Sequence, residues 1–175
     1  MEIAKQLQLS LLLGSALQFE GVIIAGFCLL ASHVGGDYFD YFCGQDEICI
    51  VIADVSGHAM GVALIIAETR STLKAEAMRI VPIQNDSDKL IRRTSTADIL
   101  HALNALLYDD LSRAELFITM FYMNYNPPTR QLSYANAGHN CSLLLPAGET
   151  VCRELDTEGI IFGVTTEMRV RGMHQ

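Results

Sequence analysis

Apolar residues recur along the chain at two different spacings, which predict a mixture of helices and strands. Helical spacing marks residues 1–13 and 59–78, and a third helix is predicted over residues 96–111 with Ser95 or Thr96 as its cap. The first helix is short and carries one apolar stripe, so it must pack on its own domain or on another chain. The pattern leaves both possibilities open.

Runs rich in apolar and β-branched residues predict strands at residues 22–31, 38–42, 47–54, 117–125, 131–136, 142–145 and 150–155. The first run is shorter than the ~20 residues that a membrane span needs, so we expect a buried strand and no membrane span. Residues 14–20 are predicted to form a connector, and residues 83–93 a polar loop. Pro82 is expected to mark the end of the preceding helix.

The order of these elements predicts a fold class. Strand pairs come first, two long helices follow, and further strand pairs close the chain. This arrangement is typical of an α+β domain with antiparallel sheets. We expect one domain over residues 14–175, preceded by the helix at residues 1–13 as a linker or dimerisation segment.

Composition restricts the classes of function. Of the 175 residues, 50% are hydrophobic and 18% are charged, which indicates a globular protein. A net charge of −8 argues against nucleic-acid binding, which needs clustered Lys and Arg. The five cysteines form no C-x-x-C pair and no signal peptide is visible, so we expect a cytoplasmic protein.

Two acidic turns carry the candidate chemistry. Asp54 ends the apolar strand in ICIVIADVSGHAM (48–60), and Asp37 lies in GGDYFD (35–40), just before the strand that pairs with it. An antiparallel hairpin can bring both carboxylates to one edge, where they suit a hard divalent cation. The alternative is that Asp54 and Ser56 cap the following helix, and the residues alone leave this open.

The two motifs occur together with a third one downstream, and the set resembles a known family. GGDYFDYF, IADVSGHAMGVALIIAETRSTLKAEA and LFITMFYMNYNPPTRQLSYANAGHNCSLLL are similar to the bacterial metal-dependent serine/threonine phosphatases of the sporulation-protein-E type, a branch of the PPM (type 2C) class. The resemblance implies an antiparallel β-sandwich flanked by helices and two Mn²⁺ or Mg²⁺ ions. It also implies catalytic and metal-binding roles for three residues: Asp54 would bridge both ions, Asp37 would bind from the other strand, and Val55 would lend its carbonyl oxygen.

Five other residues are weaker candidates. Asp40 is expected to be an exposed strand carboxylate, with a role as an acceptor behind the metal site as the alternative. His58 is either a group that orients water or a structural residue. His139 is expected to bond backbone within a tight turn. Thr119 and Asn136 match the family pattern but need no functional explanation.

The end of the chain departs from the family pattern. In the family, strands beyond the point matching Val164 carry a Thr-Asp-Gly motif whose Asp completes the metal site, whereas this sequence ends in TTEMRVRGMHQ. We therefore expect a domain that lacks its C-terminal strands, either as a piece of a longer chain or through natural loss of part of the site.

Three functions remain open from the sequence. The first is a phosphatase acting on phosphoserine or phosphothreonine of a regulatory partner protein, which the resemblance identifies as an anti-sigma-factor antagonist. The second is a catalytically impaired phosphatase-like binding module, which dimerises or joins an upstream sensor through residues 1–13. The third is a plain α+β domain whose acidic turns only cap helices, which leaves the co-occurrence of the motifs unexplained.

Overall fold

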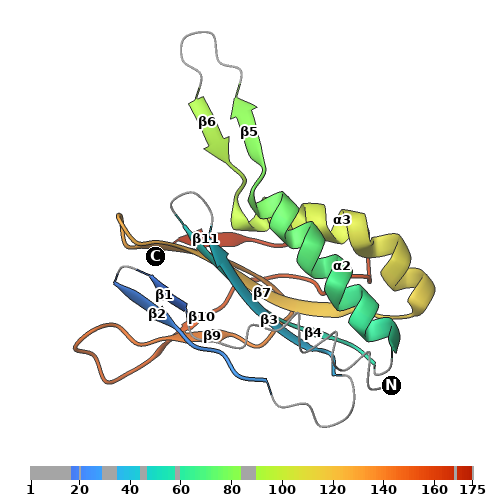
Figure 1. Cartoon of the computed structure of the whole chain (residues 1–175), viewed down its shortest axis with the longest axis horizontal. Coiled ribbons are helices and arrows are strands. Elements are labelled where there is room, and N and C mark those ends of the chain that lie inside the picture. Colours follow the sequence, from blue (N-terminus) through green and yellow to red (C-terminus); the bar gives the residue numbers. More distant parts are fainter. Residues whose placement is uncertain are drawn as a thin grey trace.

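A five-stranded antiparallel sheet forms the centre of the molecule (Figure 1). Its strands, in order across the sheet, are β11 (Gly172–His174), β8 (Gln131–Ala137), β7 (Ile118–Asn126), β4 (Ile48–Val55) and β3 (Asp37–Cys43). The computed structural model describes residues 17–19, 21–28, 35–43, 47–57, 60–83, 90–167 and 169–174. The helix predicted at residues 1–13 and the candidate His58 lie outside the described residues.

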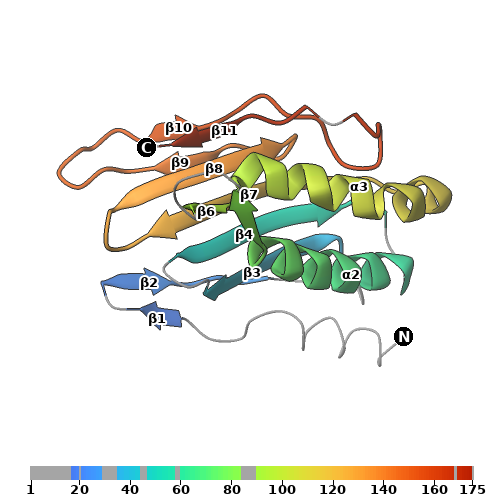
Figure 2. The same cartoon turned by 90° about the horizontal axis from the view of Figure 1, so that it is seen from above.

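Two helices, α2 (Met60–Ala77) and α3 (Thr96–Ala114), lie side by side across one face of the sheet (Figure 2). Successive strand residues point to opposite faces, so every second residue of β4 is directed at these helices. The residues of β4 that are buried on this side are Cys49, Val51, Ala53 and Val55. They form the main hydrophobic core with the apolar stripes of both helices.

Two short hairpins lie on the opposite face of the sheet (Figure 1). One pairs β1 (Leu17–Phe19) with β2 (Val22–Ile24), and the other pairs β9 (Ser142–Leu144) with β10 (Arg153–Leu155). The sheet is therefore covered by helices on one side and by strands on the other. This confirms the predicted α+β class with antiparallel sheets.

A second, smaller core lies beneath the β9–β10 hairpin. Phe121 and Tyr134 stack with their ring centroids 5.7 Å apart, and Leu155 of β10 packs against them. Because these residues come from β7, β8 and β10, they fix the hairpin to the sheet face that carries the acidic turns.

Helix α3 begins as the sequence predicts. The Ser95 side chain accepts a hydrogen bond from the Asp98 amide, and the Asp98 side chain accepts one from the Ser95 amide. This reciprocal pair satisfies two amides that a helix start leaves without partners.

The first strand, predicted at residues 22–31 as a buried strand, is shorter in the structure and is largely exposed. Gly21 (φ 77°) turns the chain back, so residues 17–19, predicted as a connector, pair with Val22–Ile24. Ile23 is 76% exposed and Phe27 is 85% exposed. The physical reason is that a two-stranded hairpin on the outside of the sheet buries one face only.

The predicted polar loop at residues 83–93 is wrong at both of its ends, which form strands, while residues 84–89 lie outside the described residues. β5 (Ile80–Ile83) pairs with β6 (Leu90–Arg93), and this hairpin projects away from the sheet (Figure 1). Pro82 lies within β5, not at the helix end, since α2 already ends at Ala77. A proline is tolerated here because each strand of a two-stranded hairpin has a free edge.

The short strand β11 was not predicted, because Gly172–His174 shows no apolar alternation. It pairs antiparallel with β8 and forms one edge of the sheet. None of the helices in the described part of the chain is long and apolar enough to cross a membrane.

Candidate metal centre

Asp37, Asp54 and Thr119 form a row of direct cross-strand neighbours on β3, β4 and β7. Asp37 pairs with Asp54, and Asp54 pairs with Thr119 on its other side. Both carboxylates are exposed, and all three residues point away from the helices. The structure thus joins the two acidic turns through the predicted hairpin.

The start of β3 comes very close to the end of β4. The amide of Val55 donates a hydrogen bond to the carbonyl of Gly36 (3.0 Å). A Cβ atom on Gly36 would collide with the Val55 carbonyl oxygen and lie 2.5 Å from Asp54 Oδ1. Gly36 therefore permits the carboxylate of Asp54 and the carbonyl of Val55 to lie at the same end of the hairpin. The Val55 side chain is buried on the other face, so only its backbone can serve this site.

The electrostatics of the row favour a bound cation. Burial raises the pKa of Asp54, and the neighbouring Asp37 carboxylate raises this pKa further, while His139 opposes the shift. Burial lowers the pKa of His139, against the attraction of both carboxylates. Two carboxylates that repel each other in a partly desolvated place are stabilised when a positive ion binds between them.

A tight turn after β8 brings His139 to the same row. The hydroxyl oxygen of Thr119 lies 2.7 Å from Nδ1 of the His139 ring. The buried Asn136 side chain bonds both backbone groups of His139: it accepts from the amide and donates to the carbonyl, each at 2.8 Å. We expected the His139 ring to bond backbone; its ring bonds a side chain, and its backbone is held by Asn136.

Sequence reasoning missed this connection between Thr119, Asn136 and His139. The signal lies in the strand pattern, because Thr119 falls on the same face of β7 as Asp54 does on β4. Its position opposite Asp54 depends on the pairing of β4 with β7, which are separated by two helices in the sequence.

A pocket of about 480 Å³ opens over the row. Its size lies within the range of small-molecule sites, which is ~300–1,000 Å³. The residues that line it are Asp37, Tyr38, Phe39, Ile52, Ala53, Asp54, Thr119, Gly138, His139 and Asn140. A phosphomonoester group fits such a volume, with the two carboxylates along one wall and His139 along another.

Asp40 is not the exposed carboxylate that we expected. It is fully buried, with its Oδ2 atom 2.8 Å from Arg70 Nε and 3.0 Å from Lys74 Nζ. Oδ1 accepts a hydrogen bond from the Tyr41 amide (2.8 Å), and the Tyr38 hydroxyl donates to Oδ2 (3.3 Å). The prediction failed because Asp40 lies three residues after Asp37 and so faces the helices.

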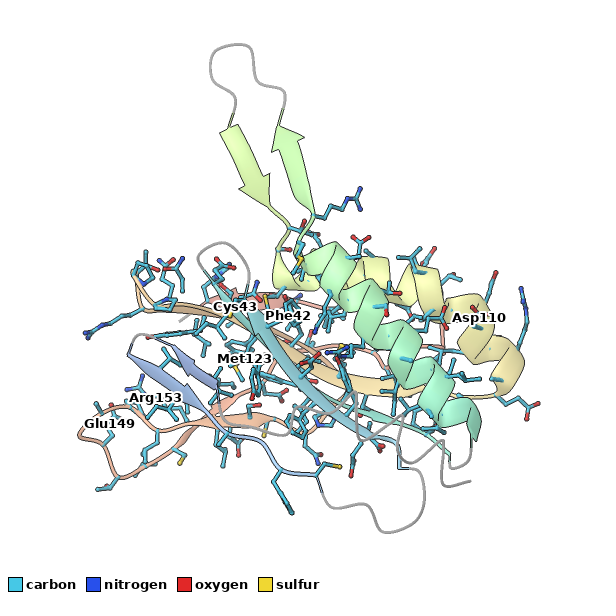
Figure 3. The ribbon with its side chains drawn as sticks, in the orientation of Figure 1. Phe42, Cys43, Asp110, Met123, Glu149 and Arg153 are labelled. Atoms are coloured by element: carbon cyan, nitrogen blue, oxygen red, sulfur yellow. The ribbon has the colours of Figure 1, made fainter. Side chains whose placement is uncertain are left out.

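The same side of β3 carries further contacts to α2. Phe42 lies on the helix side of the sheet (Figure 3), and the Lys74 ammonium group is 5.3 Å from the centre of its ring. Lys74 therefore contacts both a carboxylate and an aromatic ring of β3. This attachment fixes α2 against β3.

The donor set fits a hard divalent cation. Two carboxylates and a backbone carbonyl are oxygen ligands, and Mg²⁺ is commonly held by one or two carboxylates with several waters. Within the described residues, no group of three or more His, Cys, Asp or Glu side chains is placed to hold a metal. Asp37, Asp54 and Val55 thus suit one hydrated ion, and a second ion would need further donors.

Known proteins with similar sequences include a phosphatase. The chain is 29% identical over 168 residues to phosphoserine phosphatase RsbU of Bacillus subtilis, a match covering 95% of this chain and 45% of that protein. It is also 29% identical over 148 residues to protein IcfG of a Synechocystis species, covering 77% of this chain and 23% of that protein. The chain thus spans less than half the length of either relative.

Solved structures share the fold. The SiaA-PP2C domain of Pseudomonas aeruginosa superposes with a TM-score of 0.60 at 22% identity, covering 82% of this chain and 51% of that one. The RsbU and RsbW domains of a Mycobacterium tuberculosis protein give the same TM-score and identity, covering 82% of this chain and 37% of that one. At this level of identity the likeness establishes the fold, which is that of PP2C phosphatase domains.

The sequence match to a family is more specific. Residues 44–174 match the family of stage II sporulation protein E (SpoIIE). This segment includes Asp54, the helices α2 and α3, and the turn that carries His139. Because it covers well over half of the sequence, the chain belongs to the SpoIIE family, as its motifs predicted.

Proposed function

We propose that this chain is a metal-dependent protein serine/threonine phosphatase domain. The observation that carries the proposal is the direct pairing of Asp37 with Asp54 along the wall of an open pocket. Membership of the SpoIIE family and similarity to a phosphoserine phosphatase supply the reaction class.

The roles proposed for the site residues follow from their donor atoms. Asp54 and Asp37 would hold the cation through carboxylate oxygens, and Val55 would hold it through its carbonyl oxygen. The family resemblance implies two Mn²⁺ or Mg²⁺ ions, both of which Asp54 would contact, and the second ion would need donors beyond Asp37, Asp54 and Val55. When bound, such ions lower the pKa of water and neutralise phosphate oxygens, so no protein nucleophile is required.

The proposed substrate is a phosphorylated regulatory protein of the anti-sigma-factor-antagonist type in the cytoplasm. The similarity to a phosphoserine phosphatase supports a phosphoserine substrate, and the family resemblance of the motifs suggests the antagonist class. No cationic Lys or Arg is among the residues that line the pocket, so the described residues offer no strong attraction for phosphate before a cation binds. Attachment to an upstream sensor or a second copy through residues 1–13 stays a prediction.

The proposal is tested by measuring phosphate release from a phosphoserine peptide with the full chain. We expect turnover in Mn²⁺ that chelator abolishes, and a loss of at least about 100-fold in kcat/KM for Asp54→Asn and for Asp37→Asn. Asp110→Asn, a surface carboxylate on α3, serves as the control and should keep parental activity. Turnover that survives both chelator and Asp54→Asn would contradict the proposal.

A second candidate function is a binding module without turnover. It is favoured by one observation: the described residues bring together two carboxylates and not three. In that case the chain would bind the phosphopeptide but release no phosphate from it. Measuring binding and release on the same peptide separates the two functions.

A further inference from the structure

The pocket wall formed by His139 holds a hydrogen-bond donor that no proposed role has used. His139 is half-buried and lines the pocket together with Asp37 and Asp54. Its Nδ1 atom forms a hydrogen bond with the hydroxyl of Thr119, whose oxygen lies 2.7 Å away. Within the described residues, its other ring nitrogen, Nε2, has no hydrogen-bond partner.

The position of this ring is fixed at three points. Asn136 bonds the amide and the carbonyl of His139, and its amide group also donates to Asp156 Oδ1 at 3.2 Å. Gly138 adopts φ 67°, and a Cβ there would collide with the Ile161 side chain. Thr119, held in the sheet beside Asp54, fixes the orientation of the ring. The ring is thus held by residues of β7, β8 and the turn after β8. A histidine on an open surface usually has no such set of fixed contacts.

Among the other polar groups around the pocket, only the side chain of Asn140 could take the same role. Asp37 and Asp54 are acceptors and would repel an anion. The Tyr38 hydroxyl is directed at Asp40 on the other face. Among the lining side chains, Thr119, His139 and Asn140 are then the possible donors to an anion, and Thr119 is already bonded to His139.

We propose that His139 is a phosphate-binding residue of this site, donating a hydrogen bond from Nε2 to a phosphoryl oxygen while Thr119 donates its hydroxyl proton to Nδ1. This inference rests on the proposed phosphatase function and names the side chain that orients the phosphoryl group. It requires only the neutral ring, because a neutral imidazole that accepts at Nδ1 donates at Nε2.

The hydrogen bond between Thr119 and His139 leads to a specific prediction. Thr119→Val keeps the shape of the side chain but removes the hydroxyl that sets the tautomer. It should weaken phosphate binding, whereas Thr119→Ser, which keeps the hydroxyl, should restore it. If the ring had a purely structural role, Thr119→Val would lower the melting temperature and leave phosphate affinity unchanged.

The test measures three quantities on the full chain: Mn²⁺ affinity, affinity for inorganic phosphate in saturating Mn²⁺, and kcat/KM on a phosphoserine peptide. For His139→Ala we expect phosphate affinity to fall at least about tenfold and kcat/KM to fall about 100- to 1,000-fold, as for loss of one positioned donor. Mn²⁺ affinity should stay within about threefold. His139→Gln, which keeps a side-chain donor, should recover part of the loss, and it serves as the second variant if alanine disturbs folding.

The chain provides a matched control. His174 on β11 also has its Nδ1 atom 2.7 Å from a hydroxyl, that of Ser133, but it does not line the pocket. His174→Ala should change none of the three quantities.

The outcomes separate this inference from the proposed function. Unchanged phosphate affinity and turnover in His139→Ala would overturn the inference, and so would a tenfold loss of Mn²⁺ affinity, which would make His139 a metal ligand. If the parent binds Mn²⁺ and phosphate but does not turn over the peptide, while His139→Ala loses phosphate binding, the inference stands and the phosphatase function fails. If the parent binds neither, both fail.

Discussion

At the scale of single residues, Gly36 decides how closely the two acidic strands approach. Its missing side chain leaves room for the Val55 carbonyl and for Asp54 Oδ1. A methyl group at this position has backbone as its neighbour, and backbone in a sheet cannot move aside cheaply. The glycine is therefore a requirement of the site and of the end of the hairpin.

Gly36→Ala should lower both stability and cation affinity. We expect a fall of several degrees in Tm, about 2–4 °C per kcal/mol for a chain of this size, and at least about tenfold weaker Mn²⁺ binding. Gly61→Ala is the matched control, because a Cβ on Gly61 in α2 meets nothing within 4 Å and alanine favours a helix. Thermal melts measure the Tm, and calorimetry measures the Mn²⁺ affinity. If Gly36→Ala left both values unchanged, the close approach of Gly36 to Val55 and Asp54 would be contradicted.

Asp54 gives the metal-free protein a measurable dependence on pH. Its pKa lies above the ordinary value of 3.8, because of burial first and of Asp37 second. The folded state thus holds the Asp54 proton more tightly than the unfolded chain does. Protonated Asp54 therefore stabilises the folded state. This stabilisation is complete below pH 3.8 and is lost as the pH rises through the pKa that Asp54 has in the folded protein.

At pH 7 in chelator Asp54 is ionised in the folded state, and Asp54→Asn removes this unfavourable charge. Because Asp54 is exposed and water screens the repulsion, the variant should melt only about 1 °C higher than the parent. At pH 3 the difference should shrink, because Asp54 is then protonated in both states. Added Mn²⁺ should raise the Tm of the parent and leave the variant nearly unchanged. If the variant melted lower than the parent at pH 7 without metal, the proposed repulsion between the Asp37 and Asp54 carboxylates would be contradicted.

At the scale of elements, α2 is fastened to β3 by a buried ion cluster. Asp40 is completely enclosed, and it is bonded by Arg70 and Lys74 of the helix. Removing one member of a buried pair leaves the other charges without compensation, which commonly costs 3–5 kcal/mol. Arg70 and Lys74 are about a quarter exposed (26% and 28%), so water can recover part of that cost.

Asp40→Ala should therefore destabilise the fold by about 3 kcal/mol, or lower Tm by about 6–12 °C. Asp109→Ala is the control, since its pair with Arg113 is 3.9 Å apart and both side chains are more than three-quarters exposed. Such exposed pairs contribute about 0–1 kcal/mol. If the two variants lowered the free energy of unfolding equally in denaturant titrations, the Asp40 cluster would contribute nothing to stability.

The elements differ in how well sequence predicts them. The capping box at Ser95 and Asp98 and the pairing of β3 with β4 are local, so residue type and alternation are sufficient to predict them. The partners of Asp40 lie 30 and 34 residues away on α2. Alternation could have placed Asp40 on the helix side, but only the packing of α2 shows that two cations enclose it.

At the scale of the whole molecule, the central sheet separates the main hydrophobic core from the candidate metal site. One face carries the main core beneath α2 and α3, and the other carries the row of Asp37, Asp54 and Thr119. The sequence predicted the two carboxylates because each stands beside a recognisable motif. It did not predict the His139 wall, because Thr119 and Asn136 acquire their roles through pairing across strands that are distant in sequence.

Asp37 and Asp54 are proposed to form a site for a divalent cation. The sharpest test of this site is calorimetric titration of the full chain with Mn²⁺, on the parent and on Asp54→Asn. We predict binding by the parent and at least about tenfold weaker binding by the variant, a difference of about 1.4 kcal/mol or more. Equal affinity in the two proteins, or no binding by the parent, would contradict it.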